Sequence, residues 1–327
     1  MRTYIERPSQ KLILYLRMAR RYADMLAGRD YAHLDQGMGW HFVPGRLSGY
    51  YNDLTGKIEW PDRVDSAGLP LDRAPGGRYV YHPIVLAQKA LGHWDAWLGS
   101  GRRDVRHRES FLQIARWAVD AQDGSGGWEI WPLLGRTDAL PYSAMAQGEL
   151  MSVLVRAFSL TGEELYLGSA RQALTSMLTP IGEGGTSWLA PEGLVLEEIP
   201  YKVPKTILNG WIFALYGLHD FAMVDDTPDA RDALASTLDA LSARLYLYDA
   251  WFWSFYDSSG ALASPFYHRL HIAQLEALEL SFPERASRFR KLREAFQRQL
   301  GARLNKARAI TLLGFQKLWR PPEVLKP

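Results

Sequence analysis

The 327-residue sequence has no cysteine, which excludes disulfide bonds, thiolate metal ligands and a cysteine nucleophile. It also has almost no excess of charge: 38 Lys and Arg stand against 36 Asp and Glu, which argues against a dedicated nucleic-acid binder. No apolar run reaches the roughly 18 residues of a membrane span. The N-terminus has charges on both sides of a short apolar stretch and no small-residue cleavage site. We therefore expect no signal peptide and no membrane span, and a cytoplasmic location.

Several catalytic motifs are missing as well. The sequence contains no GxxxxGK phosphate loop, no GxGxxG fingerprint opening a helix and no HExxH zinc motif. His268 and His271 stand three residues apart without carboxylate partners nearby, which is weak evidence for a metal site. No nucleophile elbow supports a Ser-His-Asp triad. We therefore predict no metal and no cofactor, and acid–base chemistry by carboxylate, tyrosine or histidine side chains remains.

Helical periodicity dominates the sequence from Pro83 onward. Apolar residues recur every three or four positions in eight stretches, each of which predicts an amphipathic helix. The predicted helices begin near residues 84, 108, 143, 164, 206, 229, 268 and 284. Starts within a pair are roughly 16 to 24 residues apart and starts between pairs roughly 35 to 42, so the pattern indicates a repeated helical hairpin.

Repeated antiparallel hairpins that close around a centre form an (α/α) toroid, so an all-α toroid is the predicted fold class. We expect residues 81–327 to form this catalytic domain. Residues 1–80 are expected to form a helix followed by an irregular arm packed on the main body, with the helix over residues 11–26. The three long connections should gather at one end, where we expect a site: 121–142, 179–205 and 247–267. An ordinary helical array with decorated loops is the alternative.

The long connections and their neighbours carry a series of ordered sequence blocks. They are YHPI at 81–84, QDGSGGW at 122–128, YSAMAQGEL at 142–150, EE at 197–198 with LNG at 208–210, LYD to FYD over 247–257, and YH at 267–268 with HI at 271–272. Together these blocks resemble the D-glucuronyl C5-epimerase family, whose vertebrate members convert glucuronate to iduronate within heparan precursors. The resemblance covers roughly residues 79 to 282 and implies an (α/α) toroid and an isomerase.

The resemblance also implies three catalytic residues. The family's glutamate before a proline falls on Glu198, the tyrosine of its Tyr-Asp pair on Tyr256, and the tyrosine of its Tyr-His pair on Tyr267. The family's tyrosine directly after the glutamate falls on Ile199, and Tyr201 is the nearest phenol in sequence. Epimerisation removes the proton from carbon 5, next to the carboxylate, and returns one from the opposite face. Two acid–base groups flanking one carbon suit this reaction.

Further residues are predicted to bind the substrate, an anionic glycan that contains glucuronate. Lys202, Lys205 and Arg269 adjoin the acid–base residues in sequence and are expected to hold the uronate carboxylate. Aromatic and polar residues of the same blocks are expected to contact the sugar: Trp128, Tyr142, Gln147, Tyr201, Asn209 and His271. The apolar tail at residues 315–327 and the resemblance together predict a homodimer.

Two other functions fit the sequence. A uronate lyase also removes the carbon 5 proton and uses Tyr and His chemistry on a helical toroid, but it releases an unsaturated sugar. A glycan-binding protein without catalysis is the second alternative, and Ile199 in place of a family tyrosine keeps it open.

Overall fold

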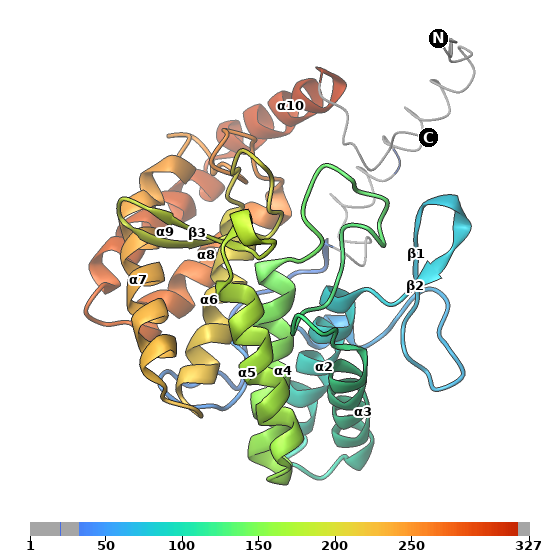
Figure 1. Cartoon of the computed structure of the whole chain (residues 1–327). Helices are drawn as coiled ribbons and strands as arrows, with labels where there is room; N and C mark the ends of the chain where they lie inside the picture. Colours follow the sequence, from blue (N-terminus) through green and yellow to red (C-terminus); the bar gives the residue numbers. More distant parts are fainter. Residues whose placement is uncertain (1–19, 21–32, 320–327) are drawn as a thin grey trace.

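The computed structural model describes residue 20 and residues 33–319 (Figure 1). Apart from residue 20, the helix predicted over residues 11–26 lies outside the described residues, and so does the end of the apolar tail. The described part is predominantly helical, which confirms the all-α class. Its helices are α2 (Pro83–Gly99), α3 (Val105–Ala121), α4 (Ala144–Thr161), α5 (Glu164–Leu178), α6 (Leu208–Ala222), α7 (Pro228–Arg244), α8 (Pro265–Ser281), α9 (Ala286–Gly301) and α10 (Arg303–Trp319).

The eight helices from α2 to α9 each begin within three residues of the predicted position. Helix α10 was not predicted from the sequence. Two short antiparallel hairpins and the 3-10 turns between the helices were not predicted either. These are β1 (Asp72–Arg73) with β2 (Tyr79–Val80), β3 (Ser187–Ala190) with β4 (Gly193–Leu196), η2 (Thr55–Lys57), η3 (Pro75–Gly77), η4 (Ile181–Glu183) and η5 (Leu245–Tyr248).

Local sequence signals explain where several helices begin and end. The side chains of Ser143 and Ser264 accept hydrogen bonds from the first-turn amides of α4 and α8, where unpaired N–H groups would otherwise remain. Thr227 does the same for α7, which has a proline in its first turn. α4 ends at Gly162, whose φ of 74° is a left-handed conformation that glycine adopts without strain.

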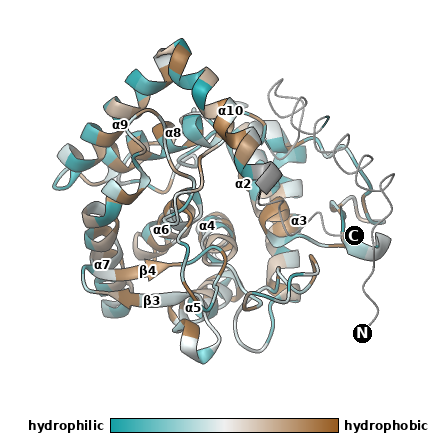
Figure 2. Cartoon of the chain, turned by 90° about the horizontal axis from the view of Figure 1, so that it is seen from above, coloured by the Kyte–Doolittle hydropathy of each residue, from teal (hydrophilic) through white to brown (hydrophobic). Residues whose placement is uncertain are grey.

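The helices pair as the repeat predicts, and α2, α4, α6 and α8 pack against one another in that order (Figure 2). α4 and α6 run parallel: Gly148 faces Ala214, and one turn further Ser152 donates a 2.6 Å hydrogen bond to Asp220. A Cβ on Gly148 would lie only 2.6 Å from the Cα of Ala214, so glycine is required for this approach. We call α2, α4, α6 and α8 the inner helices.

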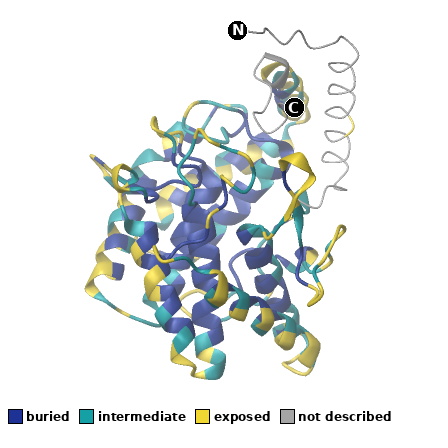
Figure 3. Ribbon diagram, turned by 45° about the vertical axis from the view of Figure 1, so that its right-hand side comes forward, coloured by how far each residue is buried: buried dark blue, intermediate teal, exposed yellow. Residues whose placement is uncertain are grey.

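The inner helices form the centre of the molecule, as the burial pattern in Figure 3 shows. In α4 every residue from Ala144 to Ala157 is buried, and α6 is buried over most of its length. Such helices are hydrophobic on all sides because other helices surround them. Polar residues inside them are therefore exceptional, and several of these residues belong to the site described below.

The three long connections meet at one end of the helical array, as the sequence predicted. The first contacts the second through a bridge between Ala139 and Tyr201, and the Leu140 amide donates to the Pro200 carbonyl at 3.1 Å. The second contacts the third through a bridge between Ile207 and Asp257. The inner helices begin at this same end, because α4, α6 and α8 each follow one of the three connections.

A segment of the N-terminal region, residues 48–51, lies among the inner helices, with residues 49–51 buried. The Tyr51 ring stacks on Tyr216 of α6 with centroids 3.9 Å apart, and its hydroxyl lies 3.1 Å from Asp220 Oδ1. Asp220 also forms a buried ion pair with Arg156 of α4. Arg156 in turn donates to the carbonyl groups of Ser48 and Gly49.

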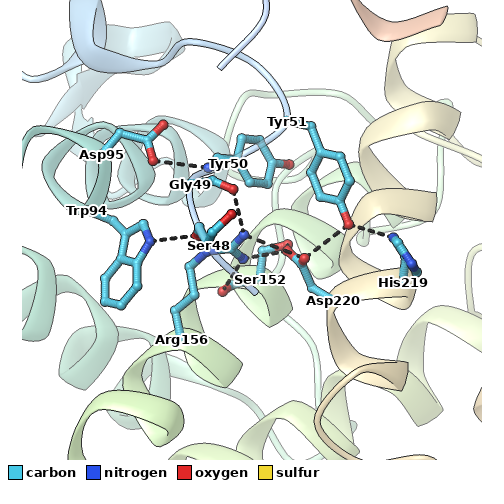
Figure 4. Close-up of polar contacts among 10 residues, drawn as sticks. All are labelled: Ser48, Gly49, Tyr50, Tyr51, Trp94, Asp95, Ser152, Arg156, His219 and Asp220. Carbon is cyan, nitrogen blue, oxygen red and sulfur yellow. Dashed lines mark hydrogen bonds and ion pairs between the residues drawn. The ribbon is translucent and has the colours of Figure 1, made fainter. Parts of the chain in front are cut away.

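Two further contacts complete this arrangement (Figure 4). The Tyr50 amide donates to Asp95 Oδ1 of α2 at 3.0 Å, and the Trp94 indole donates to the Ser48 carbonyl at 2.9 Å. Because the contacts come from α2, α4 and α6, residues 48–51 tie three inner helices together. We call the ten residues drawn in Figure 4 the arm network.

None of the helices in the described part of the chain has both the length and the apolar character needed to cross a bilayer.

Candidate active site

Glu198 lies just after β4, against the first turn of α6. The contact is so close that a Cβ added to Gly210 would lie 2.5 Å from the Cβ of Glu198. The Glu198 side chain is buried, and its Oε2 has no hydrogen-bond partner among the described residues. Burial, and to a smaller extent the charge of the neighbouring Glu197, raise the pKa of this carboxyl to about 7 against the opposing effect of Arg136. A carboxyl with such a pKa can exchange a proton near neutral pH.

Tyr256 and Tyr267 lie together next to this carboxyl. Their ring centroids are 4.7 Å apart and their hydroxyl groups are hydrogen-bonded. Burial raises the pKa of Tyr256 well above its usual value, and the charge of Glu198 raises it further. Tyr256 is therefore protonated when Glu198 is ionised. The structure thus brings the three predicted catalytic residues together.

The backbone around these residues fixes their positions. The Tyr256 carbonyl accepts a 3.1 Å hydrogen bond from the Leu208 amide, which joins the third connection to the start of α6. Tyr267 lies in the first turn of α8, where Ser264 caps its amide. The two phenols therefore reach the same place from two different elements.

Buried polar side chains continue from this cluster along the inner helices. In the first half of α2, the Gln88 amide donates a 3.0 Å hydrogen bond to Glu149 Oε1 of α4. In α8, the Gln274 amide donates to the Asn209 carbonyl of α6 at 3.2 Å. The side chains in this group have one or two buried polar atoms without a hydrogen-bond partner in the described part of the chain: Gln147 Nε2 and Oε1, Glu149 Oε2, Asn209 Oδ1 and Gln274 Oε1.

His271 is the histidine predicted in the site, and it is fully buried on α8. Its Nδ1 lies 3.2 Å from the Ser254 hydroxyl, and that hydroxyl also lies 2.8 Å from His268 Nδ1. Burial lowers the pKa of His271 to about 3, with a further contribution from His268, so the ring is neutral. Its Nε2 has no partner among residues 33–319.

The predicted cations are distributed differently. Lys205 lies over the ring of Tyr201, with Nζ 5.2 Å from the centroid. Lys202 is exposed to solvent, and Arg269 forms a 3.1 Å ion pair with Asp35. The cation that acts electrostatically on Glu198 is Arg136, which the sequence analysis did not select.

Arg136 lies in the first long connection and is the centre of a small cationic and aromatic cluster. Its guanidinium donates to the Tyr201 hydroxyl at 2.6 Å and forms a 3.0 Å ion pair with Asp138. It also lies over the Trp131 ring, 5.7 Å from the centroid. The Tyr201 phenol is therefore engaged with a cation, whereas Ile199 packs in an apolar cluster with Ile130, Trp131, Ala146 and Ile207.

Two predicted sugar-binding residues make contacts that hold a turn. The Trp128 indole is buried and donates to the Ala118 carbonyl of α3 at 2.9 Å. The Tyr142 hydroxyl donates to Asp123 at 2.7 Å, and its ring lies so close to Gly127 that a Cβ there would be 2.7 Å away. Both side chains thus fasten the connection between α3 and α4.

Four residues of the site were not predicted from the sequence: Gln88, Glu149, Gln274 and Arg136. A signal was present for one of them: in AMAQGELMSVLVRAF, the start of α4, the polar residues Gln147, Glu149 and Arg156 interrupt an otherwise apolar helix. A polar residue inside a helix buried on all sides needs a partner or a ligand. In the described part of the chain, no three His, Asp or Glu side chains are grouped so that they could hold a metal ion.

The fold and these residues define a protein of repeated helical hairpins with a buried carboxyl–phenol site at the end where the long connections meet. Residues 137–298 match the family described as D-glucuronyl C5-epimerase C-terminus. Over these residues, which make up about half of the chain, the sequence is that of a D-glucuronyl C5-epimerase C-terminal segment. The matched segment begins in the first long connection and ends in α9, so it contains Glu198, Tyr256 and Tyr267.

The chain is also similar to two curated proteins, of which the first is named a D-glucuronyl C5-epimerase. The chain is 30% identical over 200 residues to the D-glucuronyl C5-epimerase of Caenorhabditis elegans. The aligned region covers 54% of this chain and 32% of the relative. It is 29% identical over 136 residues to an uncharacterized protein of Methanocaldococcus jannaschii. The aligned region covers 40% of this chain and 44% of that protein. The chain therefore spans less than half the length of each of these relatives.

Proposed function

We propose that this protein inverts carbon 5 of glucuronate residues in a glycan, converting D-glucuronate to L-iduronate. The observation that carries the proposal is the buried Glu198 carboxyl, which has an unpartnered oxygen and lies next to the hydrogen-bonded pair Tyr256 and Tyr267. The match of residues 137–298 to the D-glucuronyl C5-epimerase family supports the same reaction.

In the proposed reaction, Glu198 removes the carbon 5 proton. The C–H bond breaks, and its electron pair moves into the uronate carboxylate to form an enolate-like dianion. Tyr267 donates its hydroxyl proton to carbon 5 from the opposite face, and Tyr256 supports the resulting phenolate by its hydrogen bond. Solvent then returns a proton to Tyr267 and removes one from Glu198. A carboxyl pKa of about 7 makes Glu198 a stronger base than an ordinary glutamate.

Positive potential around the site suits an anionic substrate. Arg136 and Lys205 both adjoin the Tyr201 ring in the connections that meet here. The inner helices begin at the same end, and helix N-termini carry partial positive charge that favours anions. We assign Arg136, Lys205 and Lys202 to the rim that holds the glycan, and Asn209, Gln147 and His271 to its inner wall.

The proposal extends to the architecture and the assembly. We infer that the four hairpins form an (α/α) toroid around the inner helices, with residues 1–80 as an arm packed on it. We also infer a homodimer in the cytoplasm. The toroid is supported by the packing order of the inner helices, and the dimer by the apolar tail.

The function is tested by incubating glucuronate-containing oligosaccharides, such as heparosan fragments, with the protein in deuterated water. We expect deuterium at carbon 5 and the appearance of iduronate signals by NMR. Unsaturated products that absorb in the ultraviolet identify a lyase instead. Binding without deuterium incorporation identifies a glycan-binding protein.

A further inference from the structure

Glu149 is a buried acid on α4 that has no role in the proton transfers proposed above. The side chain is fully buried, at 0% exposure. Among the described residues, the hydrogen bond that it makes is with Gln88, whose neutral amide donates to Oε1 at 3.0 Å. Oε2 is buried without a partner in the same part of the chain. A buried polar atom of this kind is rare in folded proteins and is often explained by a functional role.

The charges around Glu149 favour a neutral carboxyl. Burial is the largest influence and raises its pKa well above the usual value; the hydrogen bond from Gln88 lowers the pKa, and the charge of Glu198 raises it. Lys57 of η2 acts in the opposite direction, and Tyr50 of the arm network is the other titratable group coupled to this carboxyl. Two carboxyls that share a buried space cannot both be ionised at low cost, so one of the pair retains a proton. Glu149 lies deeper and makes its contact with a neutral amide.

The hydrogen bond from Gln88 determines which oxygen carries that proton. Oε1 accepts from the Gln88 amide, so it acts as the carbonyl oxygen of the acid. The proton is then on Oε2, where it makes an O–H donor that is buried and unsatisfied. Two other unpartnered oxygens of the inner helices, Asn209 Oδ1 and Gln274 Oε1, are acceptors that suit the hydroxyl groups of a sugar. The carboxylate of a uronate, by contrast, only accepts hydrogen bonds, so it needs a donor such as this O–H.

We propose that Glu149 binds the uronate as a neutral acid and that its Oε2–H donates a hydrogen bond to the substrate carboxylate. This inference rests on the proposed function and identifies the group that recognises the acidic sugar. The same hydrogen bond strengthens as charge develops on the carboxylate during removal of the carbon 5 proton, because a donor to a charged acceptor is stronger than one to a neutral acceptor. Gln88 positions Glu149 by holding its other oxygen.

The decisive comparison is between Glu149→Gln and Glu149→Met. A glutamine is neutral, accepts from Gln88 with its oxygen and presents an N–H donor where the acid presents O–H. We expect it to bind a glucuronate oligosaccharide within about threefold of the wild-type affinity. Methionine has a similar shape but no donor, so the affinity should fall about 10- to 100-fold, the usual range for a lost hydrogen bond to a charged group. Titration calorimetry measures both values.

The substrate itself provides the second comparison. Reducing the uronate carboxylate to a primary alcohol removes the charged acceptor and leaves the rest of the oligosaccharide unchanged. The loss caused by Glu149→Met should then be several times smaller with the reduced ligand. Raising the pH should weaken binding to the wild type as Glu149 ionises, and this component should be missing in Glu149→Gln. Glu198 titrates in both the wild type and Glu149→Gln, so its effect cancels in the ratio of their affinities at each pH.

Asp95→Asn is the matched control. Asp95 is also a buried carboxyl with one unpartnered oxygen, but it belongs to the arm network, where it accepts from the Tyr50 amide. We expect its substitution to leave oligosaccharide affinity unchanged. Circular dichroism and thermal unfolding verify that each variant is folded.

Three results overturn the inference. Glu149→Gln could weaken binding as much as Glu149→Met, which would mean that an ionised carboxylate is required. Glu149→Met could bind like the wild type, or lose affinity equally for both ligands. In each of these cases the wild type would still exchange the carbon 5 hydrogen, so the proposed function would not be contradicted. If the wild type neither bound the oligosaccharide nor exchanged this hydrogen, the proposed function would fail first and the inference with it.

Discussion

Replacing Gly210 by alanine should separate the position of Glu198 from its chemistry. The new Cβ would lie 2.5 Å from the Glu198 Cβ and 2.9 Å from its Cδ, well inside van der Waals contact. The carboxyl tip could turn away, but the Cβ is attached to the backbone and moves only if the segment after β4 moves. The substitution therefore displaces the carboxyl without removing it.

Two opposing terms set the effect of Gly210→Ala on stability. Alanine is more favourable than glycine inside a helix by about 1 kcal/mol. Overpacking a filled site costs about 1–3 kcal/mol. The net destabilisation should be between about 0 and 2 kcal/mol, so the protein stays folded. The effect on catalysis should be larger, since a displacement of about 1 Å in a catalytic group can lower the rate about 10²-fold.

Gly168→Ala is the matched control for this experiment. Gly168 lies in α5, where an added Cβ would meet no atom within 4 Å. This variant should be more stable than the wild type by about 1 kcal/mol and retain full activity. Deuterium incorporation at carbon 5 and thermal unfolding are measured for both variants. If Gly210→Ala kept more than half of the wild-type rate, Glu198 would not be the base.

Other perturbations test the remaining parts of the site and the fold. Tyr267→Phe and Glu198→Gln should each lower net epimerisation by about 10²- to 10⁴-fold, measured by NMR; a folded Tyr267→Phe protein with more than half of the rate would contradict the assignment. Because Glu198 must lose its proton to act as a base, and its pKa is raised to about 7, kcat/KM should rise with pH through this region; a flat profile would count against Glu198. Affinity for a glucuronate polymer should decrease as salt screens the exposed cations, and a constant affinity from low to high salt would argue against a basic rim. Arg156→Met leaves Asp220 buried without its ion-pair partner, so the free energy of unfolding should fall by about 3–5 kcal/mol in urea denaturation; a loss below about 1 kcal/mol would show that the pair is not needed.

The helices could be predicted from the sequence because their apolar residues follow the helical period over four or more turns. The same argument correctly placed the three long connections together, since the hairpins alternate short and long links. The strands β1 to β4 could not be predicted from the sequence because runs of two to four residues leave no periodic signal. Helix α10 was missed because its exposed face carries apolar residues, including Leu304 and Phe315, that obscure the pattern.

The site was only partly predictable, for a physical reason. Glu198, Tyr256 and Tyr267 stand in recognisable sequence blocks, and the structure brings them together. Gln88 and Glu149 are 61 residues apart in the chain and lie on different helices, so their contact depends on the packing of α2 against α4. Trp128 and Tyr142 show the opposite case: a residue type suited to sugar binding is engaged in holding a turn.

The arm network also has a consequence for synthesis of the chain. Tyr51 is made early, but its partner Asp220 follows 169 residues later. At a translation rate of about 5–20 residues per second, the interval is about 10–30 s. During this time the Tyr51 hydroxyl lacks the contact with Asp220 that it makes in the finished protein. The last step in assembling the inner helices must therefore enclose a segment that was synthesised first.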